Sequence, residues 1–167
     1  GGWKVAMGTL AFERGALTLG QQLGFAHEWT EMVGVAQERG VAADPVMRQR
    51  LAQTYIEVEI MRYTAMRGLT AMSRGEVTRE TSIGKLFWAN LHRGMGELAM
   101  DVMGPWSEIA NGFPYDLTRA QAMVLYTRAD TINAGSTHIQ PHLISDRARP
   151  SPPRPQPERL SPCFAAP

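Results

Sequence analysis

The chain has 167 residues, of which 44% are hydrophobic, so it can bury one core and a single domain is the default expectation. Its 17 basic and 16 acidic residues leave a net charge of +1, which gives no electrostatic footprint for nucleic acid. The single cysteine, Cys163, excludes an internal disulfide and fits a reducing compartment. No run of about 18 apolar residues occurs and no signal-peptide pattern opens the chain, so we expect a cytoplasmic protein without a membrane span.

The first two predicted helices are long. Apolar residues at helical spacing predict a helix from about Gly2 to Arg39, namely Val5, Leu10, Leu17, Leu23 and Val33. Gly40 stops it, and Asp44 followed by Pro45 gives a capping residue with proline at the first helical position. The second helix should end near Arg74 and Gly75, and its predicted buried stripe is Leu51, Tyr55, Val58, Met61, Ala65, Leu69 and Met72.

Three further helical segments follow. Ser82 can open a third helix that ends at Gly104 and Pro105, with inward residues predicted at Ile83, Phe87, Leu91, Leu98 and Val102. A fourth helix is expected from about Leu117 to Asn133, and the chain should restart as a helix at Ser136.

No strict alternation of apolar and polar residues competes with the helical period. We therefore expect an all-α fold, an antiparallel bundle resembling a four-helix bundle, over residues 1–147. Residues 148–167 hold seven of the chain's 11 prolines, which predicts a disordered proline-rich tail. Its SPPRPQP segment offers a weak PxxP-like ligand alternative.

The segment Thr127 to Gln140, TRADTINAGSTHIQ, contains the most distinctive turn. Ser136 is a natural N-cap, and Gly135 can adopt the positive φ that a sharp break needs. Unpaired N–H groups at such a helix start suit a carbonyl oxygen, a carboxylate or a phosphate. A plain turn between helices is the alternative interpretation.

Three separated blocks then agree with one family. GGWKVAMGTLAFERG, SIGKLFWANLHRGMGELAMDVMG and TRADTINAGSTHIQ resemble the C-terminal helical domain of flavin-dependent acyl-CoA dehydrogenases, in that family's order, over roughly residues 1 to 147. The resemblance implies oxidation of an acyl-CoA thioester between its α and β carbons to the 2,3-enoyl-CoA, with FAD as the hydride acceptor.

The resemblance also implies catalytic positions. The backbone N–H that stabilises the thioester oxygen matches Ala134. Many members carry the catalytic glutamate at that position, where alanine cannot accept a proton. A sub-group that includes isovaleryl- and long-chain acyl-CoA dehydrogenases instead has the base on the first helix of this domain, before an arginine, and the matching residues are Glu13 as base and Arg14 as a substrate-binding residue. A solvated surface charge is the alternative for Glu13.

FAD contacts implied by the resemblance fall on Gly135, Ser136, Thr137 and His138 and, toward a neighbouring subunit, on Arg39. The family pattern is altered nearby: Pro141 replaces an arginine and should kink or displace the last helix, and Ala42 and Ala43 replace Phe-Gly. The segment DVMGPWSE keeps Gly104 of a glutamine- and glycine-rich stretch. A helix-terminal cation is the alternative for Arg39.

No metal site is predicted. His138 and His142 have ligand spacing but no third ligand nearby, and His27 and His92 lie on helices without a carboxylate at ligand spacing. Methionines at helical spacing and the tryptophans Trp3, Trp29, Trp88 and Trp106 are expected to pack in the core or at contacts.

Expected partners are an acyl-CoA substrate and other acyl-CoA dehydrogenase subunits in a homo- or hetero-oligomer. Since the family places two further domains before this bundle, the chain is expected to be a fragment, a truncated remnant or a partner-dependent subunit. A non-catalytic oligomerisation module is the alternative function.

Overall fold

In the computed structural model, residues 2–6, 8–9, 18–74, 80–110, 116–133 and 135–148 are described. They form helices and contain no strand, which confirms the all-α prediction. Short helical stretches cover residues 2–6 and 8–9. The main elements follow in the order α2 (Thr18–Glu38), η1 (Val41–Ala43), α3 (Pro45–Ser73), α4 (Glu80–Met103), η2 (Gly104–Glu108), α5 (Arg119–Asp130) and α6 (Gln140–Ala148).

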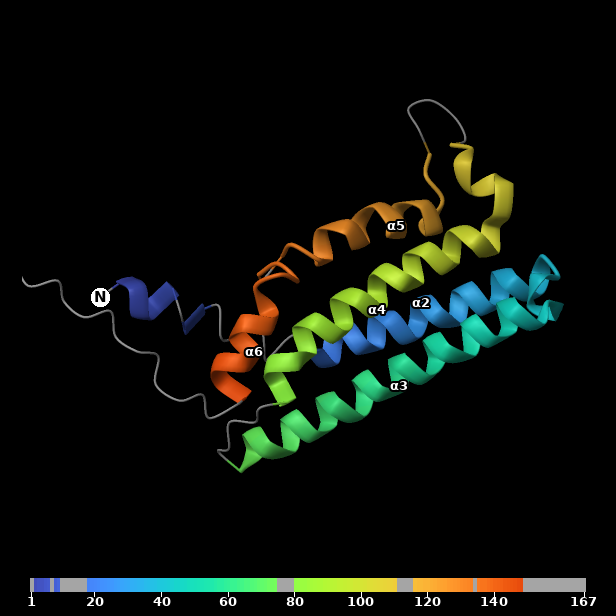
Figure 1. Ribbon diagram of the computed structural model, residues 1–167. Helices are drawn as coiled ribbons and strands as arrows, with labels where there is room; N and C mark the ends of the chain where they lie inside the picture. The colour runs from blue at the N-terminus through green and yellow to red at the C-terminus, as the bar shows by residue number, and fades with distance from the viewer. Residues whose placement is uncertain are drawn as a thin grey trace, which may run out of the picture.

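Helix α4 lies at the centre of the arrangement (Figure 1). It packs against α2, α3 and α5, while α2 and α3 also pack against each other. Successive long helices run alternately in opposite directions, and α6 contacts α4 at the end where α4 begins. The architecture is therefore an antiparallel bundle in which one helix contacts all the others.

The start of α3 follows its predicted chemistry. Gly40 adopts φ 74°, and the Asp44 Oδ1 atom accepts the backbone N–H groups of Val46 and Met47 at 2.8 Å each. Asp44 thus satisfies two donors that have no partner within the helix, and Pro45 occupies the first helical position, where it needs no donor.

The core consists of two adjoining clusters of buried side chains. One lies toward the start of α4 and the other toward its end, and their members are Phe25, Val58, Met61, Trp88, Ala89, Leu91 and Met95, then Met32, Ala36, Leu51, Leu98, Ala99 and Val102. Most of the inward positions predicted for α3 and α4 are therefore correct. The wrong assignments are Tyr55, Leu69 and Ile83, which are exposed; Val5 and Leu23, which belong to the helical period of the first predicted helix, are exposed as well. These helices carry apolar residues on a second face, so spacing alone did not single out the inward one.

Methionine and tryptophan follow their predictions in part. Met32, Met61, Met95 and Met103 are buried, as expected for core filler. Trp88 is buried and Trp29 donates its Nε1–H to the Leu51 carbonyl at 3.0 Å. Trp3 and Trp106 are exposed and pack no core within the described residues.

Helices α4 and α5 lie close together at Gly96. A Cβ atom built there would lie 2.9 Å from Thr127 Oγ1 and 3.1 Å from the Val124 Cα atom. Thr127 is fully buried, and its hydroxyl donates to the Val124 carbonyl at 2.9 Å. Glycine is therefore required for this packing distance.

The later helix boundaries differ from the predictions. Helix α4 begins at Glu80, two residues before Ser82, and α5 is shorter at both ends than predicted. The start of α5 is fixed by a capping box, because Thr118 accepts the Gln121 N–H and the Gln121 side chain accepts the Thr118 N–H.

The last helix corrects two further predictions. It begins at Gln140, after a turn over residues 137–139, and not at Ser136. Pro141 is consequently the second helical residue, where its missing N–H lacks an intrahelical acceptor in any case. The predicted kink is therefore wrong. The proline-rich tail after Ala148 lies outside the described residues.

None of the described helices combines the length and the apolar character needed to cross a membrane.

Candidate functional site

The turn between α5 and α6 is held closed by one backbone hydrogen bond and one bond from a side chain. Thr137 donates its N–H to the Thr131 carbonyl at 2.9 Å, and the Gln140 side-chain amide donates to the Gly135 carbonyl at 3.3 Å. Gly135 adopts φ 100°, the positive value that the break in the pattern predicted.

Several amides of this turn have no acceptor among the described residues. Within the described part of the chain, the N–H groups of Gly135, Ser136 and His138 donate to no other group, whereas that of Thr137 is used in closing the turn. The Ser136 carbonyl accepts from Ile139 and Gln140, and the His138 side chain is exposed. The turn therefore offers backbone donors to a ligand with an oxygen acceptor.

A buried polar cluster holds the end of α5 that leads into this turn. Lys85 on α4 is 1% exposed, and its Nζ donates to the Asp130 carbonyl at 2.5 Å. On the same helix, His92 Nδ1 lies 2.5 Å from Asp130 Oδ2, and His92 Nε2 lies 3.0 Å from Glu28 Oε2 on α2. Three helices are thus joined through one imidazole.

Aromatic contacts fix the orientation of both cations. The His92 ring stacks on Phe25 with centroids 4.2 Å apart, and Tyr126 lies edge-on to it at 6.4 Å. Lys85 Nζ lies 5.0 Å from the centre of the Trp88 ring, a cation–π distance. The cluster is therefore enclosed by apolar surface as well as paired.

Burial and pairing oppose each other in the pKa of His92. Burial lowers the pKa, while hydrogen bonds to Glu28 and Asp130 and the charges of the two carboxylates raise it, and the net effect is a raised pKa. For Lys85, burial dominates over the attraction of Asp130 and lowers the pKa below its ordinary value.

The prediction of no carboxylate at ligand spacing is wrong for His27, whose Nε2 lies 3.3 Å from Glu31 Oε1 four residues later, and His92 finds its carboxylate partners on other helices. Glu28 and Asp130 are 64 and 38 positions away in sequence, so ligand spacing could not find them. A signal was available: Lys85 and His92 lie two turns apart in an otherwise apolar stripe, which requires buried partners. Among the described residues, no group of three His, Cys, Asp or Glu is arranged to hold a metal ion.

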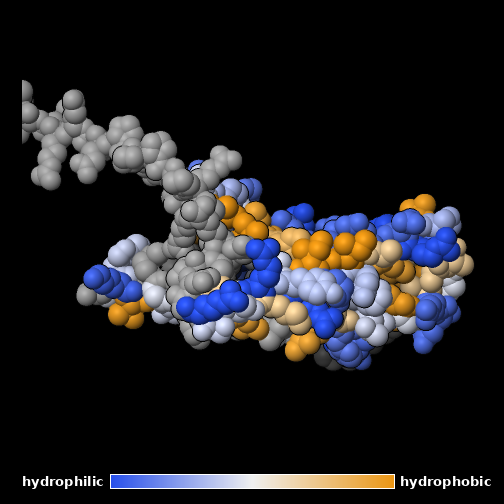
Figure 2. All heavy atoms as spheres, turned by 90° about the horizontal axis from the view of Figure 1, so that it is seen from below, coloured by the Kyte–Doolittle hydropathy of each residue, from blue (hydrophilic) through white to orange (hydrophobic). Residues whose placement is uncertain are grey.

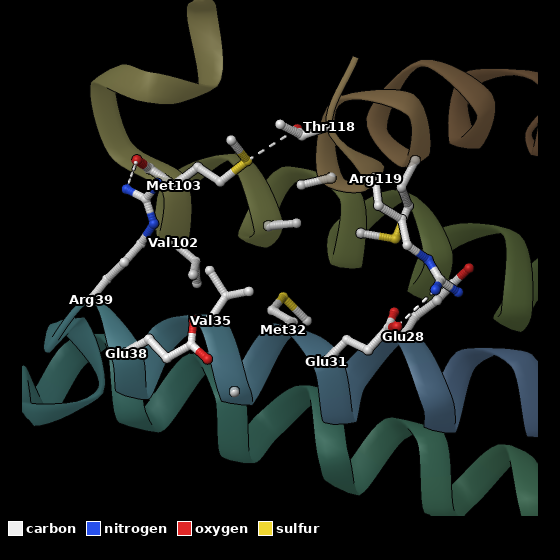
Figure 3. Close-up of a pocket in the computed structure, with 14 residues that line it drawn as sticks. Glu28, Glu31, Met32, Val35, Glu38, Arg39, Val102, Met103, Thr118 and Arg119 are labelled. Atoms are coloured by element: carbon white, nitrogen blue, oxygen red, sulfur yellow. Dashed lines mark hydrogen bonds and ion pairs between the residues drawn. The ribbon is translucent and has the colours of Figure 1, made fainter. Parts of the chain in front are cut away.

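A groove of about 500 Å³ lies between α2 and the α4–α5 pair (Figure 3). Its walls include apolar side chains from all three helices: Met32, Val35, Ala99, Val102, Met103 and Met123. At one end, the Arg39 Nη1 donates to the Met103 carbonyl at 2.9 Å, next to Gly104 with φ 60°. The end of α2 and the end of α4 are joined by this bond.

Charged residues surround the groove. Glu28, Glu31 and Glu38 line it together with Arg39 and Arg119. Arg119 pairs with Glu31 at 2.7 Å on the surface, an interaction that contributes at most about 1 kcal/mol. Figure 3 shows the two arginines at opposite ends of the groove.

The predicted site residues fall into two separate regions. Arg39 contacts Met103 at the end of α4, whereas Gly135 to His138 follow Asp130, which contacts Lys85 near the start of α4. Lys85 and Met103 are 18 residues apart on this helix, about 27 Å at 1.5 Å per residue. Glu13, Arg14 and Ala134 lie outside the described residues.

Comparison with known proteins decides the family. Residues 1–148 match the family model described as acyl-CoA dehydrogenase, C-terminal domain. The chain belongs to the acyl-CoA dehydrogenase family. The acyl-CoA dehydrogenases IpdE1 of Mycolicibacterium smegmatis and of Mycobacterium tuberculosis are each 42% identical to it, over 146 and 147 residues. These alignments cover 87% of the chain in both cases, but the chain spans only 36% and 37% of the two relatives.

Solved acyl-CoA dehydrogenase structures share the fold. The structure of a Tcur3481-Tcur3483 steroid ACAD aligns with a TM-score of 0.73 at 22% identity, over 87% of this chain and 38% of that one. Its G363A variant aligns with a TM-score of 0.71 at 21% identity, over 86% and 38%. The helical arrangement described above is therefore that of the family's C-terminal domain.

Proposed function

We propose that the chain supplies the C-terminal helical part of an FAD-dependent acyl-CoA dehydrogenase that converts an acyl-CoA thioester to the 2,3-enoyl-CoA. The α C–H bond breaks with its proton passing to a carboxylate, the β hydrogen leaves as hydride, and a C=C bond forms. Bound FAD supplies the hydride acceptor at its N5 atom. The observation that carries the proposal is the turn after α5, in which the amides of Gly135 and Ser136 have no acceptor among the described residues, beside a buried and paired anchor.

Loss of the α proton requires stabilisation of the developing enolate oxygen, because a carboxylate is too weak a base for an unassisted thioester. In the proposal, the Ala134 N–H donates to that oxygen, Glu13 accepts the α proton, and Arg14 contributes to substrate binding. The free amides at Gly135 and Ser136 support this role for the turn, since its donors are not consumed within the described fold.

The residues present fit FAD at two places. The Arg39 guanidinium is exposed and is oriented by its bond to the Met103 carbonyl, which leaves other N–H donors for a phosphate. The segment from Gly135 through Ser136 and Thr137 to His138 offers backbone N–H groups at the opposite end of the bundle. Since about 27 Å of α4 separates the two places, we assign them to different flavins, each completed by another chain.

That separation makes an oligomer part of the proposed function. The structural neighbour is a steroid ACAD whose name combines Tcur3481 and Tcur3483. We extend from it only the expectation that this chain works beside other acyl-CoA dehydrogenase subunits, of the same or a different kind. Co-purification followed by measurement of the assembly's mass and flavin content would identify the arrangement.

The test of the catalytic role is Glu13→Gln in the flavin-loaded assembly. Turnover of acyl-CoA should fall at least about a hundredfold, because the proton acceptor is lost, with flavin absorbance unchanged. Glu57→Gln, at a glutamate on α3 that accepts a hydrogen bond from Gln53, is the matched control and should keep turnover. Wild-type turnover in Glu13→Gln would refute the assignment of the base.

One observation favours a second candidate, a non-catalytic oligomerisation module. The outward side of α3 carries exposed apolar residues along its length, including Ile56, Ile60 and Tyr63. Figure 2 views the molecule from the side on which α3 lies and shows apolar side chains gathered between charged ones. Flavin spectroscopy separates the two functions, because a yellow oligomer supports the enzyme and a colourless one supports the module.

A further inference from the structure

Asp130 is the residue at which the buried cluster meets the functional turn. It is the last residue of α5 and 4% exposed. Lys85 holds its backbone carbonyl and His92 holds its carboxylate, so both the main chain and the side chain are fixed from α4. No other end of a described helix is held by two buried cationic side chains.

The turn begins at the next residue. The Thr131 carbonyl accepts the Thr137 N–H and closes the loop that contains Gly135 at φ 100°. A movement of Asp130 would therefore displace the neighbouring Thr131 carbonyl, which closes the loop. The amides of Gly135 and Ser136 would then change direction as well. This sequence of contacts connects His92 to the turn without any direct contact between them.

We propose that His92, acting through Asp130, is a positioning residue that keeps the amides of Gly135 and Ser136 in place for the ligand of this turn. The inference rests on the proposed function for the identity of the ligand, but the mechanical link itself needs only the described contacts. Lys85 fixes the position of the turn along the axis of α4 through the Asp130 carbonyl. His92 fixes the orientation of the turn through the Asp130 carboxylate.

The groups around His92 make this link dependent on its proton. Glu28 faces the ring from α2, Asp130 and Tyr126 face it from α5, and Lys85 lies two turns away on α4. A protonated ring donates to both carboxylates, whereas a neutral ring donates to only one. Loss of the proton removes one of the two bonds and leaves two carboxylates near an uncharged group, so the turn should loosen as pH rises.

The experiment is an NMR titration of the labelled 167-residue chain. It is carried out in a His138→Gln background, so that no second imidazole lies within the turn whose amides are followed. The His92 ring and the amides of Gly135 and Ser136 are followed together, and we expect one shared midpoint above about 6.5. His92→Gln should abolish the amide step, while His27→Gln, at an exposed histidine on α2, should preserve it.

Two results would overturn the inference: turn amides that do not follow the His92 midpoint, or an amide step that persists in His92→Gln. The midpoints in the His138→Gln background alone decide the matter if the added His92→Gln change prevents folding, and Asp130→Asn provides a second variant of nearly unchanged size. In the flavin-loaded assembly, His92→Gln should lower kcat roughly tenfold to a hundredfold, with KM and flavin content little changed.

These readouts separate the two proposals. A shared midpoint in the chain, together with a flavin-loaded assembly that oxidises no acyl-CoA, would support the positioning link and reject the proposed function. Turnover without a shared midpoint would support the function and reject the link.

Discussion

At the scale of single residues, His92 shows how a buried charge is made acceptable. Its imidazole lies between the carboxylates of Glu28 and Asp130, so a protonated ring forms a hydrogen bond to each of them. Phe25 stacks on the ring. Removing one partner would leave an uncompensated charge in an apolar setting, which is costlier than the pair itself is favourable.

The raised pKa of His92 predicts how stability depends on pH. The folded state binds the proton more tightly than the unfolded state, so this contribution is fully present below about pH 6.5 and is lost as pH rises through the raised folded pKa. Urea unfolding at a series of pH values should therefore show a falling free energy of unfolding above about pH 6.5. His92→Gln should flatten that decline, and an identical decline in the variant would contradict the assignment.

The sequence shows which residues form this cluster but does not show that they contact one another. Lys85 and His92 were visible as polar residues in a buried stripe, yet their partners come from α2 and α5, and the pairing depends on how α4 packs between those helices. Contacts across 38 and 64 positions are set by the packing register, which local spacing does not encode.

At the scale of elements, the contact between α4 and α5 depends on one glycine. Gly96→Ala would place a Cβ within 3.1 Å of the Val124 Cα atom, a backbone atom that cannot move alone, and should cost about 1–3 kcal/mol of stability. Gly94→Ala, two residues earlier on the same helix with nothing within 4 Å, is the matched control.

Gly94→Ala should stabilise the protein by roughly 0.5–1 kcal/mol, because alanine is the better helix former. Thermal and urea unfolding of the two variants measure the contrast. Equal and favourable effects at both positions would show that α4 and α5 are not in the close contact described.

Helix ends were predicted well where two signals coincide. Asp44 with Pro45 placed the start of α3 correctly, since the cap and the proline both demand that position. At the last helix the signals conflicted. Ser136 indicated a helix start that would place Pro141 inside the helix, where proline predicts a kink. Starting the helix at Gln140 removes the conflict, because proline is tolerated in a first turn.

At the scale of the whole molecule, the outward face of α3 predicts association. Ile60 is 46% exposed between two other exposed apolar residues, so Ile60→Glu should weaken self-association by placing a charge in the contact. Analytical ultracentrifugation should show a smaller average mass for this variant. Leu125→Glu, at a 62% exposed residue on α5, is the control, and an effect there but not at Ile60 would place the interface elsewhere.

All-α architecture, the order of the helices and most inward positions of α3 and α4 followed from periodicity and the turn residues, whereas periodicity did not separate some exposed apolar residues from buried ones. Leu23, Tyr55 and Leu69 fit the helical period as well as the buried Met32 and Val58 do. Their exposure depends on how many helices surround each face, which is a property of the assembled chain.

The distance between Arg39 and the turn at Gly135 has a genetic consequence. If each site combines the arginine of one chain with the turn of another, two different defects can compensate for each other. Chains carrying Arg39→Ala and chains carrying Gly135→Val should each be inactive alone, the latter because valine is strained at φ 100°. Mixed in equal amounts, they should regain about a quarter of the wild-type sites, since half of the dimers are mixed and each contains one intact pair. Two defective chains would then be active together where neither is active alone.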